Sequence, residues 1–75
     1  MELEKLINVI AEVLDVDASG ITGESRFVED LGADSLDFLE IVMSVEDEFG
    51  IKVPIEDVKD ISTVQDAYEE IKKAL

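Results

Sequence analysis

The sequence predicts an all-α fold, a four-helix bundle made of three main helices plus a short third helix. Two observations support this prediction. Apolar residues recur at spacings of three and four over most of the chain, which is the period of a helix that buries one face. No segment shows the alternation of apolar and polar residues that marks a half-buried strand. A length of 75 residues fits a single domain, 1–75, with a small core.

The first helix is expected over residues 2–14. Polar residues such as Glu4, Asn8 and Glu12 would face water, on the side opposite the apolar face. The inner face is formed by apolar residues three and four positions apart: Leu3, Leu6, Ile7, Ile10, Val13 and Leu14.

A long loop between the first two helices is expected over residues 15–30, because this stretch lacks sustained periodicity and contains Gly20 and Gly23. A loop of this length is unusual in a small domain and is often functional or held by buried anchors. The expected anchors are the apolar residues in and just after the loop: Ile21, Phe27, Val28 and Leu31.

The central helix is expected between Asp34 and Gly50. The carboxylate of Asp34 can accept hydrogen bonds from the free amides of the first turn, so Asp34 is a good N-cap. Asp37 lies three residues further on and completes an approximate capping box. Gly50 favours the left-handed conformation that commonly ends a helix.

Two apolar stripes run along this central helix. The first follows an ordinary core spacing and consists of Phe38, Ile41, Val42, Val45 and Phe49. The second lies on another face, is flanked by the acids Glu40, Glu46 and Asp47, and consists of Leu36, Leu39 and Met43. A helix in a small domain cannot easily bury both faces, so we interpret the second stripe as an exposed docking surface. The alternative is that a long neighbouring segment covers it.

After Gly50, the sequence Ile51-Lys52-Val53-Pro54 reads as an extended connector, because the residue before proline disfavours helix. One or two helical turns are expected over residues 55–61, with Ile55, Val58 and Ile61 pointing inward. Ser62 or Thr63 should cap the last helix, in which Thr63 and Asp66 form a capping box. Its buried face is predicted to consist of Val64, Ala67, Tyr68, Ile71 and Leu75.

The net charge is −14, from 20 acids and 6 bases, and it restricts the classes of partner. Nucleic acids and anionic membrane surfaces are disfavoured, because both need cations opposite their phosphates. We expect protein partners with basic patches and salt-sensitive encounters, and the alternative is an acidic surface that only increases solubility. No apolar run could span a bilayer and no signal-peptide pattern is present, so a cytoplasmic protein is expected.

The composition argues against catalysis by the chain itself. It contains neither Cys nor His, which removes thiolate chemistry and the commonest general base. Residues 15–26 begin like an EF-hand calcium loop, with oxygen-bearing Asp15, Asp17 and Ser19 followed by Gly20. The twelfth position, however, is the cation Arg26 where a bidentate glutamate is needed. We therefore expect no enzyme and no metal site, with an acidic calcium-binding module as the alternative from another class.

Ser35 follows the N-cap of the central helix, a position where free amides and the helix dipole favour a phosphate group. Most serines in a first turn only help to start the helix. The surrounding residues add more, because three motifs closely resemble the acyl carrier proteins of type II fatty acid synthesis. These motifs are Leu31–Asp37 (LGADSLD), Glu40–Met43 (EIVM) and Glu46–Ile51 (EDEFGI). The resemblance extends over nearly the whole chain.

The resemblance implies that Ser35, beside Asp34, carries a covalent 4′-phosphopantetheine group transferred from coenzyme A by a separate phosphopantetheinyl transferase. A chain without cysteine would obtain its thiol in this way. It also implies that fatty acid synthesis enzymes dock on the central helix through Leu36, Asp37, Leu39, Glu40, Met43, Glu46 and Asp47. Acyl chains would be sheltered by a pocket lined by Phe38, Ile41, Val42, Val45, Phe49 and Ile61.

The resemblance has departures and alternatives. Phe38 stands where many members of the family have a small Thr or Ser, near the expected mouth of the pocket, which leaves the preferred length of the acyl chain open. Gly23 replaces a proline that is often found before the Phe27 segment. The last helix stops at Leu75, as expected of a free-standing carrier and not of a module within a megasynthase. A monomer is expected. The nearest alternative function is a carrier of another pathway, with a polyketide, lipid A-type or D-alanyl cargo.

Overall fold

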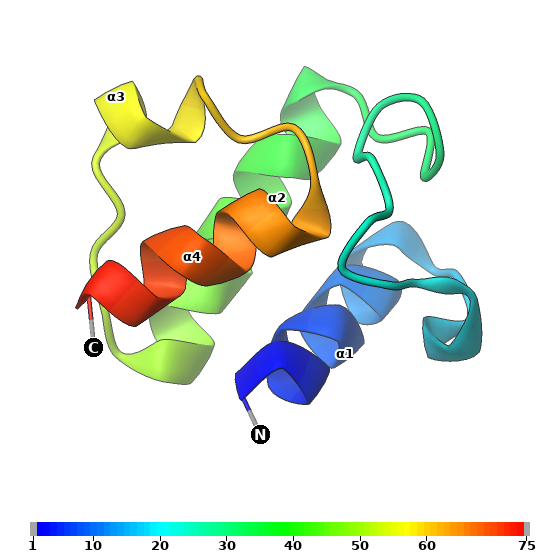
Figure 1. The fold of residues 1–75 in the computed structure, drawn as a ribbon, viewed down its shortest axis with the longest axis horizontal. Coiled ribbons are helices and arrows are strands. Elements are labelled where there is room, and N and C mark those ends of the chain that lie inside the picture. Colours follow the sequence, from blue (N-terminus) through cyan, green and yellow to red (C-terminus); the bar gives the residue numbers. More distant parts are fainter. Residues whose placement is uncertain (1, 75) are drawn as a thin grey trace.

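The computed structural model describes residues 2–74 and shows the predicted all-α fold. The helices are α1 (Glu2–Leu14), α2 (Ser35–Phe49), α3 (Ile55–Val58) and α4 (Val64–Ala74), and a 3-10 turn, η1 (Ala18–Gly20), lies in the first loop. Figure 1 shows α3 at one corner, with the long first loop on the other side of the molecule. Among the described residues, the β-structure is limited to one isolated bridge between Arg26 and Thr63.

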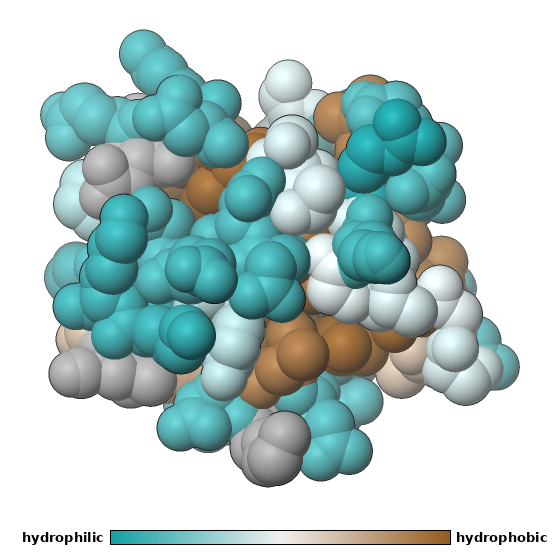
Figure 2. All heavy atoms as spheres, in the orientation of Figure 1, coloured by the Kyte–Doolittle hydropathy of each residue, from teal (hydrophilic) through white to brown (hydrophobic). Residues whose placement is uncertain are grey.

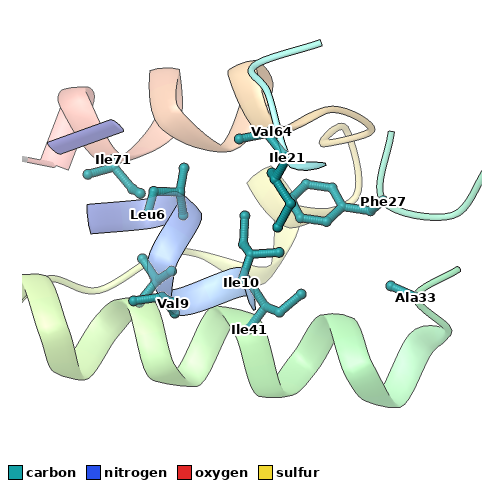
Figure 3. Packing of buried hydrophobic residues seen from close by; sticks show 10 residues of the cluster. Leu6, Val9, Ile10, Ile21, Phe27, Ala33, Ile41, Val64 and Ile71 are labelled. Carbon is teal, nitrogen blue, oxygen red and sulfur yellow. The ribbon is translucent and has the colours of Figure 1, made fainter. Parts of the chain in front are cut away.

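The core forms where α1 contacts both α2 and α4. Leu6 and Ile10 of α1 are fully buried, and Figure 3 shows them between Ile41 of α2 and the α4 residues Val64 and Ile71. The outer side of α4 carries hydrophilic side chains, and apolar side chains are visible between α4 and α1 in Figure 2. The helical spacing therefore predicted the buried Leu6 and Ile10 of α1 and Val64 and Ile71 of α4 correctly. It missed Val9 of α1, which is also buried, and the other residues predicted on the inner face of α1 are half-buried.

The first loop is held by backbone hydrogen bonds to the start of α4. The amide of Phe27 donates to the carbonyl of Ser62 (3.0 Å), that of Val64 to Ser25 (3.0 Å) and that of Gln65 to Gly23 (2.8 Å). Ile21 and Phe27 are buried and Leu31 packs against the core, as expected of anchors. These contacts fix the path of the loop between α1 and α2.

Val28 is not an anchor, and this prediction was wrong: its side chain is 66% exposed. The reason is local geometry. The amides of Asp30 and Leu31 both donate to the carbonyl of Arg26, and the amide of Ala33 donates to that of Phe27 (2.8 Å). This tight turn buries Phe27 and leaves its neighbour Val28 on the outside.

The predicted caps of α2 are present. The carboxylate of Asp34 accepts from the amide of Asp37 (2.9 Å), and that of Asp37 accepts from the amide of Asp34 (3.3 Å). Gly50 ends the helix with φ 64° and donates to the carbonyl of Glu46. Because a side chain at this φ would be strained, glycine suits the position. The caps place Ser35 as the first residue of α2.

The short helix after the connector has one turn, within the one or two turns predicted. α3 is a single turn that ends at Val58, and Val58 and Ile61 are half-buried. The side chain of Ile55 and the residue Leu75, both predicted to point inward, lie outside what the structure describes. The Thr63–Asp66 capping box is confirmed: the amide of Asp66 donates to the Thr63 hydroxyl, and the amide of Thr63 donates to the Asp66 carboxylate, both at 3.1 Å.

Candidate functional site

Ser35 lies at the N-terminal end of α2, with an exposed side chain. The two neighbouring acids are already engaged, because Asp34 and Asp37 hold each other's backbone amides in the capping box. The first turn of the helix is therefore fixed, and the serine hydroxyl is presented to solvent at the positive end of the helix dipole. This arrangement suits a serine that accepts a negatively charged group.

A surface groove of about 400 Å³ adjoins Ser35. Its walls come from three parts of the chain: the loop before α2, the first turns of α2, and the segment from α3 to α4. Most lining residues are apolar, namely Phe27, Val28, Ala33, Phe38, Leu39, Val58 and Ile61. The others are Glu29, Asp34, Ser35, Lys59 and Ser62. An open, largely apolar groove beside this exposed hydroxyl offers space for an apolar group.

A second, much smaller space lies between α1, α2 and α4 and is partly open to the surface. Its volume is about 20 Å³, which is room for about one water molecule, since one water needs roughly 10–15 Å³ on this measure. Five of the six predicted pocket residues line it: Phe38, Ile41, Val42, Val45 and Ile61. The sixth, Phe49, is not among its lining residues and instead packs its ring below the Lys5 ammonium, 5.0 Å from the ring centre.

Three residues, Phe27, Phe38 and Ile61, line both the groove and the smaller space. The two phenylalanine rings pack edge to face, with ring centres 5.1 Å apart and an interplanar angle of 70°. Such aromatic pairs are favourable beyond the area that they bury. The aromatic pair and Ile61 are therefore shared by the groove and the smaller space.

The second apolar stripe is exposed: Leu36 by 66%, Leu39 by 49% and Met43 by 64%. The described residues therefore do not cover it, which removes the alternative of a neighbouring segment. Glu40 and Asp47 are exposed and Asp37 is half-buried. Glu46 is also half-buried, and its carboxylate accepts a hydrogen bond from the amide of Val53 (2.8 Å). Glu46 thus supports the connector after α2 and is less free than the other acids to meet a partner.

Arg26 is engaged by acids of its own loop. Its guanidinium donates to both carboxylate oxygens of Asp30 at 3.3 Å, and Glu29 lies 3.5 Å away. The hydrogen bond from Arg26 lowers the pKa of the Asp30 carboxyl, and the same bond with the nearby charge of Asp30 raises the pKa of Arg26. Among the described side chains, which do not include that of Asp57, no group of three or more Asp or Glu residues is placed to hold a metal ion. The carboxylate of Asp17 accepts from the amide of Ser19 instead, as the cap of η1.

Several groove residues were missed in the sequence, including Val28, Val58 and Lys59. Val28 was assigned to the core, and the other two come from a segment about twenty residues after Ser35. The signal that was missed for Val28 is the tight turn at residues 26–31. This turn buries Phe27 and leaves the adjacent Val28 exposed.

Comparison with known proteins agrees with this geometry. Residues 4–71 match the family model described as a phosphopantetheine attachment site. The fold is similar to that of a Mycobacterium tuberculosis protein provisionally described as an acyl carrier protein, with a TM-score of 0.86 and 38% sequence identity. That similarity covers 95% of this chain and 96% of the other. No helix within residues 2–74 is long and apolar enough to cross a bilayer.

Proposed function

The chain belongs to the phosphopantetheine-attachment family of acyl carrier proteins, and on that premise we propose that it carries fatty acyl chains for fatty acid synthesis, with Ser35 as the attachment residue. The family is one of carriers, which bear 4′-phosphopantetheine covalently and are not themselves catalytic. The observation that carries the proposal is the position of Ser35, exposed at the capped start of α2 and beside an apolar groove.

The residues present fit the attached group. The Ser35 oxygen would form a bond to a phosphorus of coenzyme A, the bond from that phosphorus to the 3′,5′-ADP leaving group would break, and the serine proton would pass to a base of the transferase. The amides at the start of α2 favour the resulting negative charge. When bound, the group supplies a terminal thiol for thioester formation, which this cysteine-free chain cannot supply itself.

The proposed docking surface for the transferase and the synthesis enzymes is the exposed stripe of Leu36, Leu39 and Met43 with the acids Asp37, Glu40 and Asp47. A partner with a basic patch would be steered by the net charge of −14 and would release readily, because exposed ion pairs are individually weak. Weak docking suits a carrier that must leave each enzyme in turn. We assign Glu46 a smaller share, since Val53 already uses its carboxylate.

The proposal treats residues 1–75 as one carrier domain that acts as a monomer in the cytoplasm, without a metal and without catalysis of its own. The high negative charge supports the monomer, because like charges oppose self-association. The apolar lining of the groove favours an alkyl cargo over the small polar cargo of a D-alanyl carrier.

The test is the intact mass after incubation with coenzyme A, magnesium and a broad-specificity phosphopantetheinyl transferase. We expect a gain of one phosphopantetheinyl group in the wild type and none in Ser35→Ala. The matched control is Ser62→Ala, which removes the other serine that lines the same groove. Loss of the gain in Ser62→Ala but not in Ser35→Ala would refute the assignment, and no gain in any variant with an active transferase would refute the carrier function.

Assignment to fatty acid synthesis needs a second step. The phosphopantetheinylated protein is offered to a malonyl transferase and a ketosynthase of type II fatty acid synthesis, and separately to a D-alanine ligase. Formation of malonyl and then elongated acyl thioesters supports the proposal. Exclusive charging with D-alanine would assign the chain to the other pathway.

A further inference from the structure

The groove at Ser35 is lined by two acidic residues and one basic residue. The acids are Glu29 and Asp34, and the base is Lys59, from the segment that follows α3. No other Lys or Arg lines the groove among the described residues, and α2 itself contains none. A phosphate attached to Ser35 would therefore share the groove with two carboxylates and a single ammonium group.

The two carboxylates of the groove already have partners, whereas the ammonium has none. Asp34 accepts from a backbone amide of the first turn of α2 (2.9 Å), and Glu29 lies 3.5 Å from the guanidinium of Arg26. Lys59 is exposed, and among the described side chains, which do not include that of Asp57, its ammonium forms no hydrogen bond or ion pair. Its charge is therefore available to an added anion.

The start of α2 compensates a phosphate at Ser35 only in part. The amide of Asp37 is occupied by the carboxylate of Asp34, and the carboxylates of both residues lie at the first turn, where they reduce its positive potential. The phosphate is bonded directly to the serine oxygen, so it lies next to this turn wherever the rest of the arm goes. A cation from another segment would stabilise it.

Lys59 meets this requirement by position and by chemistry. It lines the same groove as Ser35, and Figure 1 shows the segment after α3 and the start of α2 at the same edge of the molecule. Lysine carries a compact ammonium on a flexible four-carbon stem, which can adjust to a phosphate as a point charge.

We propose that Lys59 binds the phosphate that Ser35 receives, through an ion pair between its ammonium and a phosphodiester oxygen. This inference rests on the proposed function, since it takes Ser35 as the attachment residue. The ion pair would draw the near end of the arm toward the segment after α3 and leave the thiol end unrestrained. Because Lys59 is exposed, the pair is weak and sensitive to salt, so a basic partner enzyme can replace it.

The first test compares the reactivity of lysine amines before and after attachment of the arm. Both proteins are treated with iodoacetamide to block the thiol and then with a trace of acetic anhydride at low salt. Only the neutral amine reacts and an ion pair favours the ammonium, so acetylation of Lys59 should slow about two- to threefold on attachment. The difference should disappear in about 1 M NaCl. Peptide mass spectrometry measures the rates.

The internal control for this test is Lys52, which is also exposed but does not line the groove. Its acetylation rate should stay unchanged on attachment. An unchanged rate at Lys59 would overturn the proposal. An equal fall at Lys52 would also overturn it, because the effect would then come from the added net charge alone.

The second test observes the phosphate itself by phosphorus NMR. In the phosphopantetheinyl wild type, the resonance should move between low salt and about 1 M NaCl, because salt screens the ion pair. Lys59→Gln should lose most of this movement, and Lys59→Arg should retain it, since a guanidinium also binds phosphate. The matched control, Lys52→Gln, removes the same charge outside the groove and should behave as the wild type. Wild-type behaviour of Lys59→Gln, or equal losses in both Gln variants, would contradict the pairing.

The two proposals fail in different ways. Mass spectrometry establishes one phosphopantetheinyl group on Ser35 before either measurement is made. Failure to load the protein refutes the carrier function, whereas a loaded protein that fails either test refutes only the assignment of Lys59.

Discussion

On the inner face of α2, Ile41 and Val45 are 2% and 5% exposed, whereas on the outer face Leu36 and Met43 are 66% and 64% exposed. Both faces carry large apolar side chains, so composition does not distinguish them. What distinguishes them is the set of neighbours: α1 packs against the inner face, and no described segment covers the outer one. Apolar residues beyond those that the core uses are the clearest sign in this chain of a surface for another molecule.

The largest expected effect distinguishes the two faces by stability. Ile41→Ala should lower the free energy of unfolding by about 2–5 kcal/mol, because it leaves a cavity in a small core. Met43→Ala, on the exposed face, should change it by about 0.5 kcal/mol or less. Urea denaturation followed by circular dichroism measures both. Similar losses in the two variants would mean that the outer face is buried in solution.

The second prediction distinguishes the faces by function. Glu40→Lys should reduce kcat/KM for transfer of phosphopantetheine about tenfold at low salt, corresponding to about 1.4 kcal/mol, because it reverses a charge within the docking surface. The difference from the wild type should shrink as the ionic strength rises.

The control for this prediction is Glu69→Lys, which makes the same change in net charge at an exposed position of α4. Its transfer rate should stay near that of the wild type. Equal losses in the two variants would indicate that only net charge matters, and the assignment of a docking surface on α2 would fail.

The third prediction concerns Asp34, the N-cap of α2, which precedes both the inner and the outer face. Asp34→Ala should destabilise the protein by about 1 kcal/mol, because it removes the acceptor for the Asp37 amide. Asp34→Asn keeps an acceptor oxygen and should lose much less. Thermal unfolding of both variants measures the difference. Equal stability of Asp34→Ala and the wild type would show that the cap contributes nothing.

The features that could be predicted from the sequence are those formed by residues close to one another along the chain. Both capping boxes involve residues three positions apart, so the pattern itself contained them, and the helical period identified Ile41 and Val45 as buried. The exposed stripe was predictable for the same reason. The identity of Ser35 as a special residue needed the surrounding motifs, because one serine in a first turn carries little information.

The errors and omissions come from contacts between distant segments or from single turns. Nothing local indicates that Phe27 pairs with Ser62 or that Glu46 accepts from Val53. The assignment of Val28 to the core failed because a turn, and not a helix or a strand, decides which way it points. The groove was missed for the first reason, since its walls meet only after the loop is fixed on the start of α4.

The smallest expected effect is the pH dependence of stability that Asp66 contributes, which must be distinguished from that of the other acids in the chain. The Asp66 carboxylate accepts hydrogen bonds from the amides of Ser62 and Thr63, which lower the pKa of Asp66. The Asp66 carboxylate therefore binds a proton less readily in the folded state than in the unfolded chain, where the pKa of an aspartate is about 3.9. The stabilisation is fully present above that pH and is lost as pH falls through the lower pKa of the folded state.

Asp66→Asn isolates this contribution. Protonation of the other acids relieves repulsion within a chain of net charge −14 and acts in the opposite direction, so the wild type alone would not reveal the Asp66 effect. The stability difference between wild type and Asp66→Asn should be largest near neutral pH and should shrink in acid. Glu12→Gln, which removes one exposed charge from α1, measures the general effect. A difference for Asp66→Asn that does not depend on pH would mean that its hydrogen bonds do not favour the charged carboxylate in solution.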